Sequence, residues 1–340
     1  MTPKTPLLRL LNLLTGAGIL LASPALATQP GEPSPEVEPA SPVKKKSPYS
    51  LPWQLRPAMP GSVVRSDTSV AMFDVKTPAG DASGSTIASM LLFSYKVSDA
   101  LAPLVRLGYV TTKLDDADRV SAFVNPVVGA TYGMPIGDDL KLGLFLGVAL
   151  PLGQGGGDRG DPTSDTSKRY AAASSGIYAR AAMDNAMFAV NYLTVFPGVG
   201  LAYVSDGLTI QGEVTVLSLN RARGDDAVEA DKSRWNLTSG LHVGYFVLDM
   251  LSLGAELRYQ RWLSTPKFVE TDEDAPADAQ RGLRDQATFA VGPRLHVELG
   301  PGLWLRPGIA YSRGIDKPMA GANVGPTNYN IVQLDVPLAF

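Results

Sequence analysis

The chain has 340 residues, a net charge of −3 and no cysteine. This length suits one large all-β domain or two ordinary domains, and the charge balance shows no basic excess that would indicate nucleic-acid binding. Without cysteine, the chain cannot form a disulfide scaffold, a cysteine-ligated metal site or a lipid-modified N-terminal cysteine.

Residues 1–27 have the pattern of a secretory signal peptide. Lys4 and Arg9 supply the positive start, an apolar run follows from Leu10, and Ala25-Leu26-Ala27 forms a small-x-small cleavage site. The run is too short to be a good spanning helix. We predict cleavage after the last of these alanines and no membrane-spanning helix elsewhere.

Residues 28–61 are rich in proline and charge, with nine prolines between positions 30 and 60. Such a segment cannot bury enough apolar surface to fold alone, which predicts an extended and disordered periplasmic segment. A spacer is the plain interpretation. The alternative is a tether to a periplasmic partner or to peptidoglycan, with Lys44, Lys45 and Lys46 as contact candidates.

Residues 62–340 show a repeated period-two alternation of apolar and polar side chains. In Leu140–Leu150 the even positions are apolar and the odd positions are small or polar, which is typical of a strand with two different faces. The pattern predicts one β-barrel domain with twelve strands, at residues 66–75, 85–97, 102–113, 121–135, 139–152, 189–204, 207–221, 233–248, 251–264, 285–299, 302–315 and 329–340. Fourteen strands would result if residues 153–188 contained a hairpin.

Two features favour a barrel that spans a membrane over a soluble sandwich. Alternate connections are tight while the intervening ones are long and polar, which predicts short periplasmic turns and long extracellular loops. Aromatic side chains also occur near both ends of the outward faces, as in the two interfacial belts of a membrane protein. These residues are Tyr109, Trp235, Tyr259 and Tyr311 at one end, and Tyr95, Tyr132 and Tyr203 at the other.

The last strand alternates through Val332, Leu334, Val336 and Leu338 and ends on Phe340. A terminal strand of this kind resembles the assembly signal of bacterial outer-membrane β-barrels of the porin-like type. The resemblance implies an all-β, transmembrane, antiparallel up-and-down barrel in the outer membrane of a Gram-negative bacterium. Lipid, lipopolysaccharide and the barrel assembly machinery are then the implied partners.

Charged side chains on the inward faces are the candidate pore-lining residues. They would form either a charged constriction that selects solutes or an ion-paired network that fills a narrow lumen. Their mixed sign argues against strong ion selectivity, while inward glycines such as Gly143 and Gly240 would leave space inside. The candidates are Arg106, Lys141, Glu213, His242, Glu256, Arg258, Arg294, His296, Glu298, Arg306 and Asp335.

No catalytic, metal or cofactor site is expected. The two histidines are predicted to point inward without a serine beside them on the lipid-facing side, and no nucleophile-elbow motif occurs. Asp158, Asp161 and Asp165 could hold a calcium ion, but solvated loop acids are commoner.

The long connection at residues 153–188 includes an alanine-rich half, Ala171–Ala186, that favours a helix. Long ordered loops are usually functional, so this loop would either constrict the barrel or cap it. The leading functional hypothesis is a porin-like channel for small polar solutes. The alternative is a non-conducting barrel that anchors a trans-envelope complex, such as motility or secretion machinery.

Overall fold

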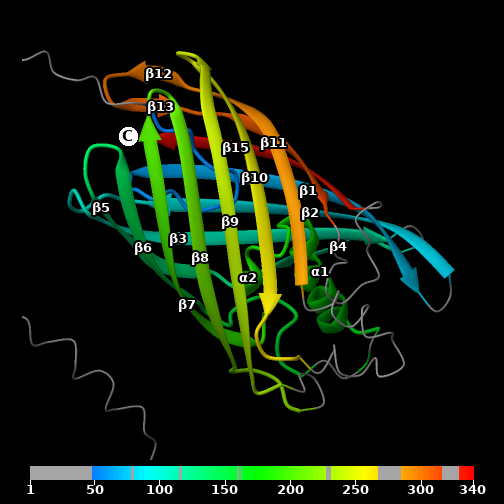
Figure 1. Cartoon of the computed structure of the whole chain (residues 1–340). Helices are drawn as coiled ribbons and strands as arrows, with labels where there is room; N and C mark the ends of the chain where they lie inside the picture. Colours follow the sequence, from blue (N-terminus) through cyan, green and yellow to red (C-terminus); the bar gives the residue numbers. More distant parts are fainter. Residues whose placement is uncertain are drawn as a thin grey trace, which may run out of the picture. The chain divides into compact units, whose positions relative to one another are not determined.

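In the computed structural model, the described strands form one closed β-barrel (Figure 1). The structure describes residues 48–77, 80–114, 117–158, 161, 163–226, 231–266, 285–315 and 329–340. The expected signal peptide and the three candidate contact lysines, Lys44, Lys45 and Lys46, lie outside these ranges.

All strand pairings are antiparallel, and β1 pairs with β15 from Val63↔Ala339 to Phe73↔Tyr329, which closes the barrel. Three spans are each broken into two strands (β4 with β5, β11 with β12, and β13 with β14), so the barrel has twelve spans. The strands are β1 (Val63–Thr77), β2 (Gly80–Ser94), β3 (Leu101–Leu114), β4 (Val120–Phe123), β5 (Val127–Pro135), β6 (Leu140–Ala149), β7 (Tyr192–Ser205), β8 (Leu208–Arg221), β9 (Ser233–Leu248), β10 (Leu251–Trp262), β11 (Asp285–Leu295), β12 (Val297–Gly300), β13 (Leu303–Leu305), β14 (Gly308–Gly314) and β15 (Tyr329–Ala339).

The predicted antiparallel up-and-down barrel and its count of twelve strands are confirmed. The strand expected at residues 66–75 is β1, which pairs with β2 on one side and β15 on the other. The described part of loop 153–188 contains helices rather than a hairpin, so the fourteen-strand alternative is wrong.

The outer surface of the barrel is apolar. On β6, Leu144 and Leu146 are 42% and 54% exposed, while the glycines on either side of this pair, Gly143 and Gly147, are buried. Other spans alternate in the same way, and the aromatic side chains expected at the interfaces, such as Trp235, are exposed apart from the half-buried Tyr259. Apolar surface of this extent requires an apolar environment such as lipid.

The residues that precede β1 fold inside the barrel, and we call residues 48–62 the N-terminal plug. Trp53 and Leu55 are each 1% exposed. The expectation of a disordered segment is therefore wrong for residues 48–61. The barrel wall supplies the apolar surface and hydrogen-bond partners that a proline-rich segment cannot supply for itself.

Part of the connection from β6 to β7 also folds into the lumen, and we call the described residues of this connection, 153–158, 161 and 163–188, the inner loop. It contains α1 (Asp165–Ala179) and α2 (Asn185–Phe188), which lie at one end of the barrel in Figure 1. Ser164 caps α1 by accepting a hydrogen bond from the Ser167 amide. Among the described residues, no helix is long and apolar enough to cross a membrane.

Candidate functional site

Carboxylates of the barrel wall hold the N-terminal plug by its backbone. The Glu256 carboxylate on β10 accepts hydrogen bonds from the amides of Trp53 and Gln54. Glu213 on β8 accepts from both the amide and the guanidinium of Arg56, each at 2.6 Å. Hydrogen bonds to charged groups are stronger than neutral ones, so these contacts fix the plug against β8 and β10.

Glycines on the inner wall accommodate the plug. A Cβ atom at Gly240 would lie 2.3 Å from the Leu55 side chain, and one at Gly308 would lie 2.5 Å from the Trp53 ring. At Gly143, a Cβ would lie 2.7 Å from the Ala58 carbonyl oxygen. Gly143 and Gly240, which were expected to leave space in the lumen, therefore leave space that the plug fills.

A buried ion-paired network joins the plug to the barrel seam. Asp335 on β15 lies between Arg65 at 2.7 Å and Arg294 at 2.5 Å. Arg65 also donates to the carbonyl oxygens of Trp53 and Pro52. Because these groups are almost fully buried, each charge requires its partners.

A second network holds the segment of the inner loop around Arg180 and Asp184, which we call its tip. Asp184 receives two hydrogen bonds from Arg106 on β3, at 2.6 and 2.9 Å, and one from Arg180 at 2.8 Å. Arg180 also contacts Asp67 on β1 at 2.6 Å. Burial raises the pKa of Asp184, but the two guanidinium groups lower it more, so that this pKa lies well below its usual range. The tip is therefore held by charge at neutral pH.

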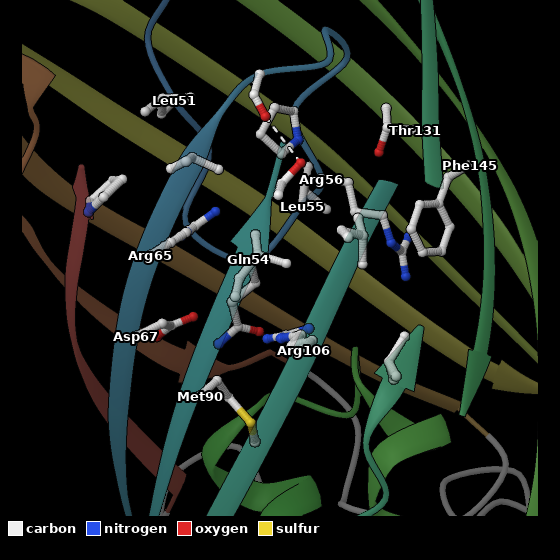
Figure 2. A pocket seen from close by; sticks show the side chains of 18 of the residues that line it. Leu51, Gln54, Leu55, Arg56, Arg65, Asp67, Met90, Arg106, Thr131 and Phe145 are labelled. Carbon is white, nitrogen blue, oxygen red and sulfur yellow. Dashed lines mark hydrogen bonds between the residues drawn. The ribbon is translucent and has the colours of Figure 1, made fainter. Parts of the chain in front are cut away.

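The plug and the inner loop leave a cavity of about 280 Å³ against the barrel wall, where strands β1, β2, β3, β5, β6, β7, β8 and β15 all contribute lining residues. Figure 2 shows Arg65, Arg106 and Phe145 of the wall together with Leu51 and Leu55 of the plug around this space. The cavity reaches from the rim where β1 begins and β15 ends to the tip of the inner loop. Its lining includes Val63 and Ala339 at the rim and Asp184 and Met187 at the loop.

Three arginines of the cavity wall lie in one cross-strand row. Arg65 is paired with Pro337 on one side and with Leu92 on the other. Leu92 is paired with Arg106, and the Arg306 amide donates to the Pro337 carbonyl oxygen at 2.9 Å. Guanidinium groups thus alternate with apolar side chains along the row, from Arg306 to Arg106.

The sequence-predicted pore-lining residues divide into three groups. Arg106 and Arg306 line the cavity, whereas Glu213, Glu256 and Asp335 hold the plug or its network and Arg258 pairs with Glu256 at 2.8 Å. His242, Arg294 and His296 are buried and Lys141 is half-buried, and these four do not line the cavity.

Glu298 was expected to point inward and is exposed. The span breaks at His296, and among the described strands β12, which carries Glu298, pairs with β13 alone and not with β10. Ser252 lies 2.9 Å from the His296 ring, a pairing that the sequence did not indicate. Both residues are buried inside the barrel, away from lipid.

The functional residues that sequence reasoning missed are mainly in the plug and the inner loop. Arg56, Arg180 and Asp184 fall in segments without strand periodicity, and Arg65 precedes the strand predicted at residues 66–75. One available signal was the set of inward acids in neighbouring spans, such as Glu213 and Glu256, because buried carboxylates need partners.

The closed twelve-span antiparallel barrel, with its apolar exterior and polar interior, has the architecture of a transmembrane β-barrel. No protein-family model matches the chain, and no curated protein matches its sequence.

Several solved structures are similar in architecture. An outer membrane channel from Pseudomonas putida F1 is 13% identical, with 90% of this chain and 100% of that chain covered and a TM-score of 0.49. The NanC porin is 9% identical, with 81% and 98% covered and a TM-score of 0.45. The translocator domain of the autotransporter NalP from Neisseria meningitidis is 12% identical, with 82% and 88% covered and a TM-score of 0.41. Because these barrels differ in their named roles, the likeness assigns no solute to this chain.

Proposed function

We propose that the protein is an outer-membrane channel for small polar solutes, closed in this structure by the N-terminal plug and the inner loop. The observation that carries the proposal is the cavity that runs between them from one rim of the barrel to the ion-paired tip of the inner loop. A barrel with only a structural role would have no need to keep such a space next to two separate internal segments.

The inner loop has the features of an element with two positions. Ala181 and Ala182, next to its tip, have φ angles of 49° and 55°. A left-handed conformation costs an L-residue roughly 1–2 kcal/mol, and this cost is offset only while the tip stays bound to Arg106 and Asp67. Outward movement of the tip would release that strain and extend the cavity toward the other end of the barrel.

We place the short connections and the chain termini on the periplasmic side, as in other outer-membrane barrels. Secretion would follow from the signal peptide at residues 1–27. Insertion would use the terminal Phe340, which is half exposed and donates its amide to the Ser62 carbonyl oxygen. The plug would then close the periplasmic part of the lumen, and the inner loop the extracellular part.

A reversible disulfide tests whether the plug closes the channel. The hydroxyl oxygens of Ser50 and Ser252 are 3.4 Å apart, and the chain has no other cysteine that would interfere. We expect the Ser50→Cys/Ser252→Cys protein to be silent in a planar bilayer when oxidised. On reduction it should conduct like the unmodified chain, and each single-cysteine variant should conduct under both conditions.

A second protein that begins at Gly61 lacks all of the plug except its last two residues and should conduct more than the full chain. Heat-modifiable mobility in gel electrophoresis reports whether each protein has folded. Equal conductance of the oxidised and reduced double variant would remove the plug from the gating mechanism. Silence of every folded protein would contradict the channel proposal.

The filled lumen also favours the second candidate, a non-conducting barrel that anchors a trans-envelope complex. In that case the segment at residues 28–47, with Lys44, Lys45 and Lys46, would bind a periplasmic partner or peptidoglycan. Deletion of residues 28–47 spares the plug and should abolish cross-linking to that partner while leaving membrane insertion intact. Unchanged cross-linking would count against the anchor.

A further inference from the structure

We infer that the cavity binds small amphipathic monoanions, in which one carboxylate is carried on an apolar body. This inference names the class of solute that the proposed channel would carry. The passage of the solute through the barrel rests on the channel proposal, whereas its binding in the cavity does not.

The charge of the cavity favours an anion. Five guanidinium groups line it, from Arg56, Arg65, Arg106, Arg180 and Arg306. Four of them, Arg56, Arg65, Arg106 and Arg180, share four carboxylates, those of Glu213, Asp335, Asp184 and Asp67. Among the described residues, Arg306 has no carboxylate partner, and its Nε atom is buried without a hydrogen bond. One positive charge in the cavity is therefore left without a counter-charge.

Arg306 is also well placed for a ligand that enters from the rim. It stands at the end of the arginine row next to Pro337, which itself lines the cavity. Its guanidinium lies 5.5 Å from the centre of the Trp304 ring, a contact that leaves the guanidinium nitrogens free to donate to an anion. A carboxylate is the planar acceptor that a guanidinium binds best, through two parallel hydrogen bonds.

The remainder of the lining favours an apolar body. Aliphatic and aromatic side chains from the plug and the wall face the space between the arginines, among them Leu51, Leu55, Leu92, Leu104, Phe145 and Phe196. An apolar cavity of about 150 Å³ is large enough for benzene. The volume of about 280 Å³ therefore admits one ring with a short acidic side chain, but not a long oligomer.

Isothermal titration calorimetry on the refolded full chain in detergent tests the inference with three probes. The first is 3-phenylpropionate, the second is the neutral 3-phenylpropanol, which has the same body, and the third is propionate, which has the charge alone. We expect 3-phenylpropionate to bind at least about tenfold more tightly than either of the others, because it alone uses both the free guanidinium and the apolar lining.

Arg306→Gln should weaken binding of 3-phenylpropionate about tenfold or more and leave binding of the alcohol unchanged. Arg306→Lys, which keeps the charge, should lose less. Arg313→Gln is the matched control, since Arg313 is an exposed arginine on the neighbouring β14. The comparison of the three probes on the unmodified chain remains decisive even if a variant does not fold.

Equal affinity for 3-phenylpropionate and 3-phenylpropanol would overturn the inference, as would an equal loss in the Arg313 variant. Conductance without binding of 3-phenylpropionate would also overturn it while leaving the channel proposal in place. Selective binding without conductance in any variant would support the site and refute the channel.

Discussion

Replacement of Asp184 by asparagine should release the tip of the inner loop. The change removes the one carboxylate that Arg106 contacts and one of the two that Arg180 contacts, at distances of 2.6 to 2.9 Å. Loss of one partner of a buried ion pair costs about 3–5 kcal/mol. The Arg106 side chain is 20% exposed and Arg180 keeps Asp67, so we reduce this to about 2–3 kcal/mol.

That cost corresponds to a roughly 30- to 150-fold increase in the population with the tip released, since about 1.4 kcal/mol is tenfold. Hydrogen–deuterium exchange of the amides at residues 181–187 measures this population. The Ala182 amide, which donates to the Ile177 carbonyl oxygen at 2.9 Å, should exchange faster by that factor. Unchanged exchange would refute the role given to Asp184, and so would an equal increase in Asp158→Asn, a variant in the exposed part of the same loop.

Three further predictions concern the plug, the seam and pH. Gly143→Ala should increase the rate of hydrogen exchange in the plug, because the new Cβ would lie 3.0 Å from the Ala58 Cα atom. Gly212→Ala is the control and should leave that rate unchanged, since the nearest atom to its new Cβ would be 4.0 Å away. Asp335→Asn should lower the free energy of unfolding by about 3–5 kcal/mol in urea titrations, since Arg65 and Arg294 would lose their shared carboxylate. The pKa of Asp184 is lower in the folded protein than the ordinary carboxyl pKa of about 3.9 that applies to the unfolded chain. Its contribution to stability is therefore complete above that ordinary pKa and is lost as the pH falls through the lower pKa of the folded protein. Channel opening should therefore increase with acidification only below about pH 4, and an opening that sets in near pH 6 would contradict this assignment.

The spans were predictable because exposure along a barrel strand depends on a local pattern. In β10, Glu256 and Arg258 face inward and Leu253 and Leu257 face lipid, as alternation at every second residue requires. The boundaries of β1 were less predictable. Arg65 and Asp67 are buried polar residues on its inward face, so the start of this strand has little apolar contrast.

The plug could not be predicted from its own composition. Its prolines indicate disorder, and its order depends on contacts to residues about 160 to 280 positions away, such as Gln211 and Gln333. The apolar residues Leu51, Trp53 and Leu55, set between prolines, were the local sign that this segment differs from the rest of residues 28–61. The sequence also could not predict whether the inner loop lies inside the barrel or covers its end, because an alanine-rich helix fits either position.

The position of the plug directly before β1 has a consequence for biogenesis. β1 is the first strand and β15 the last, and their eleven residue pairs close the cylinder. The plug contacts β8 and β10 through its amides, and β1 and β15 through its carbonyl oxygens, so its contacts join the first and last strands to the middle of the sheet. We therefore expect the plug to be in place by the time the first and last strands pair, so that closure of the barrel encloses the segment that leads into β1.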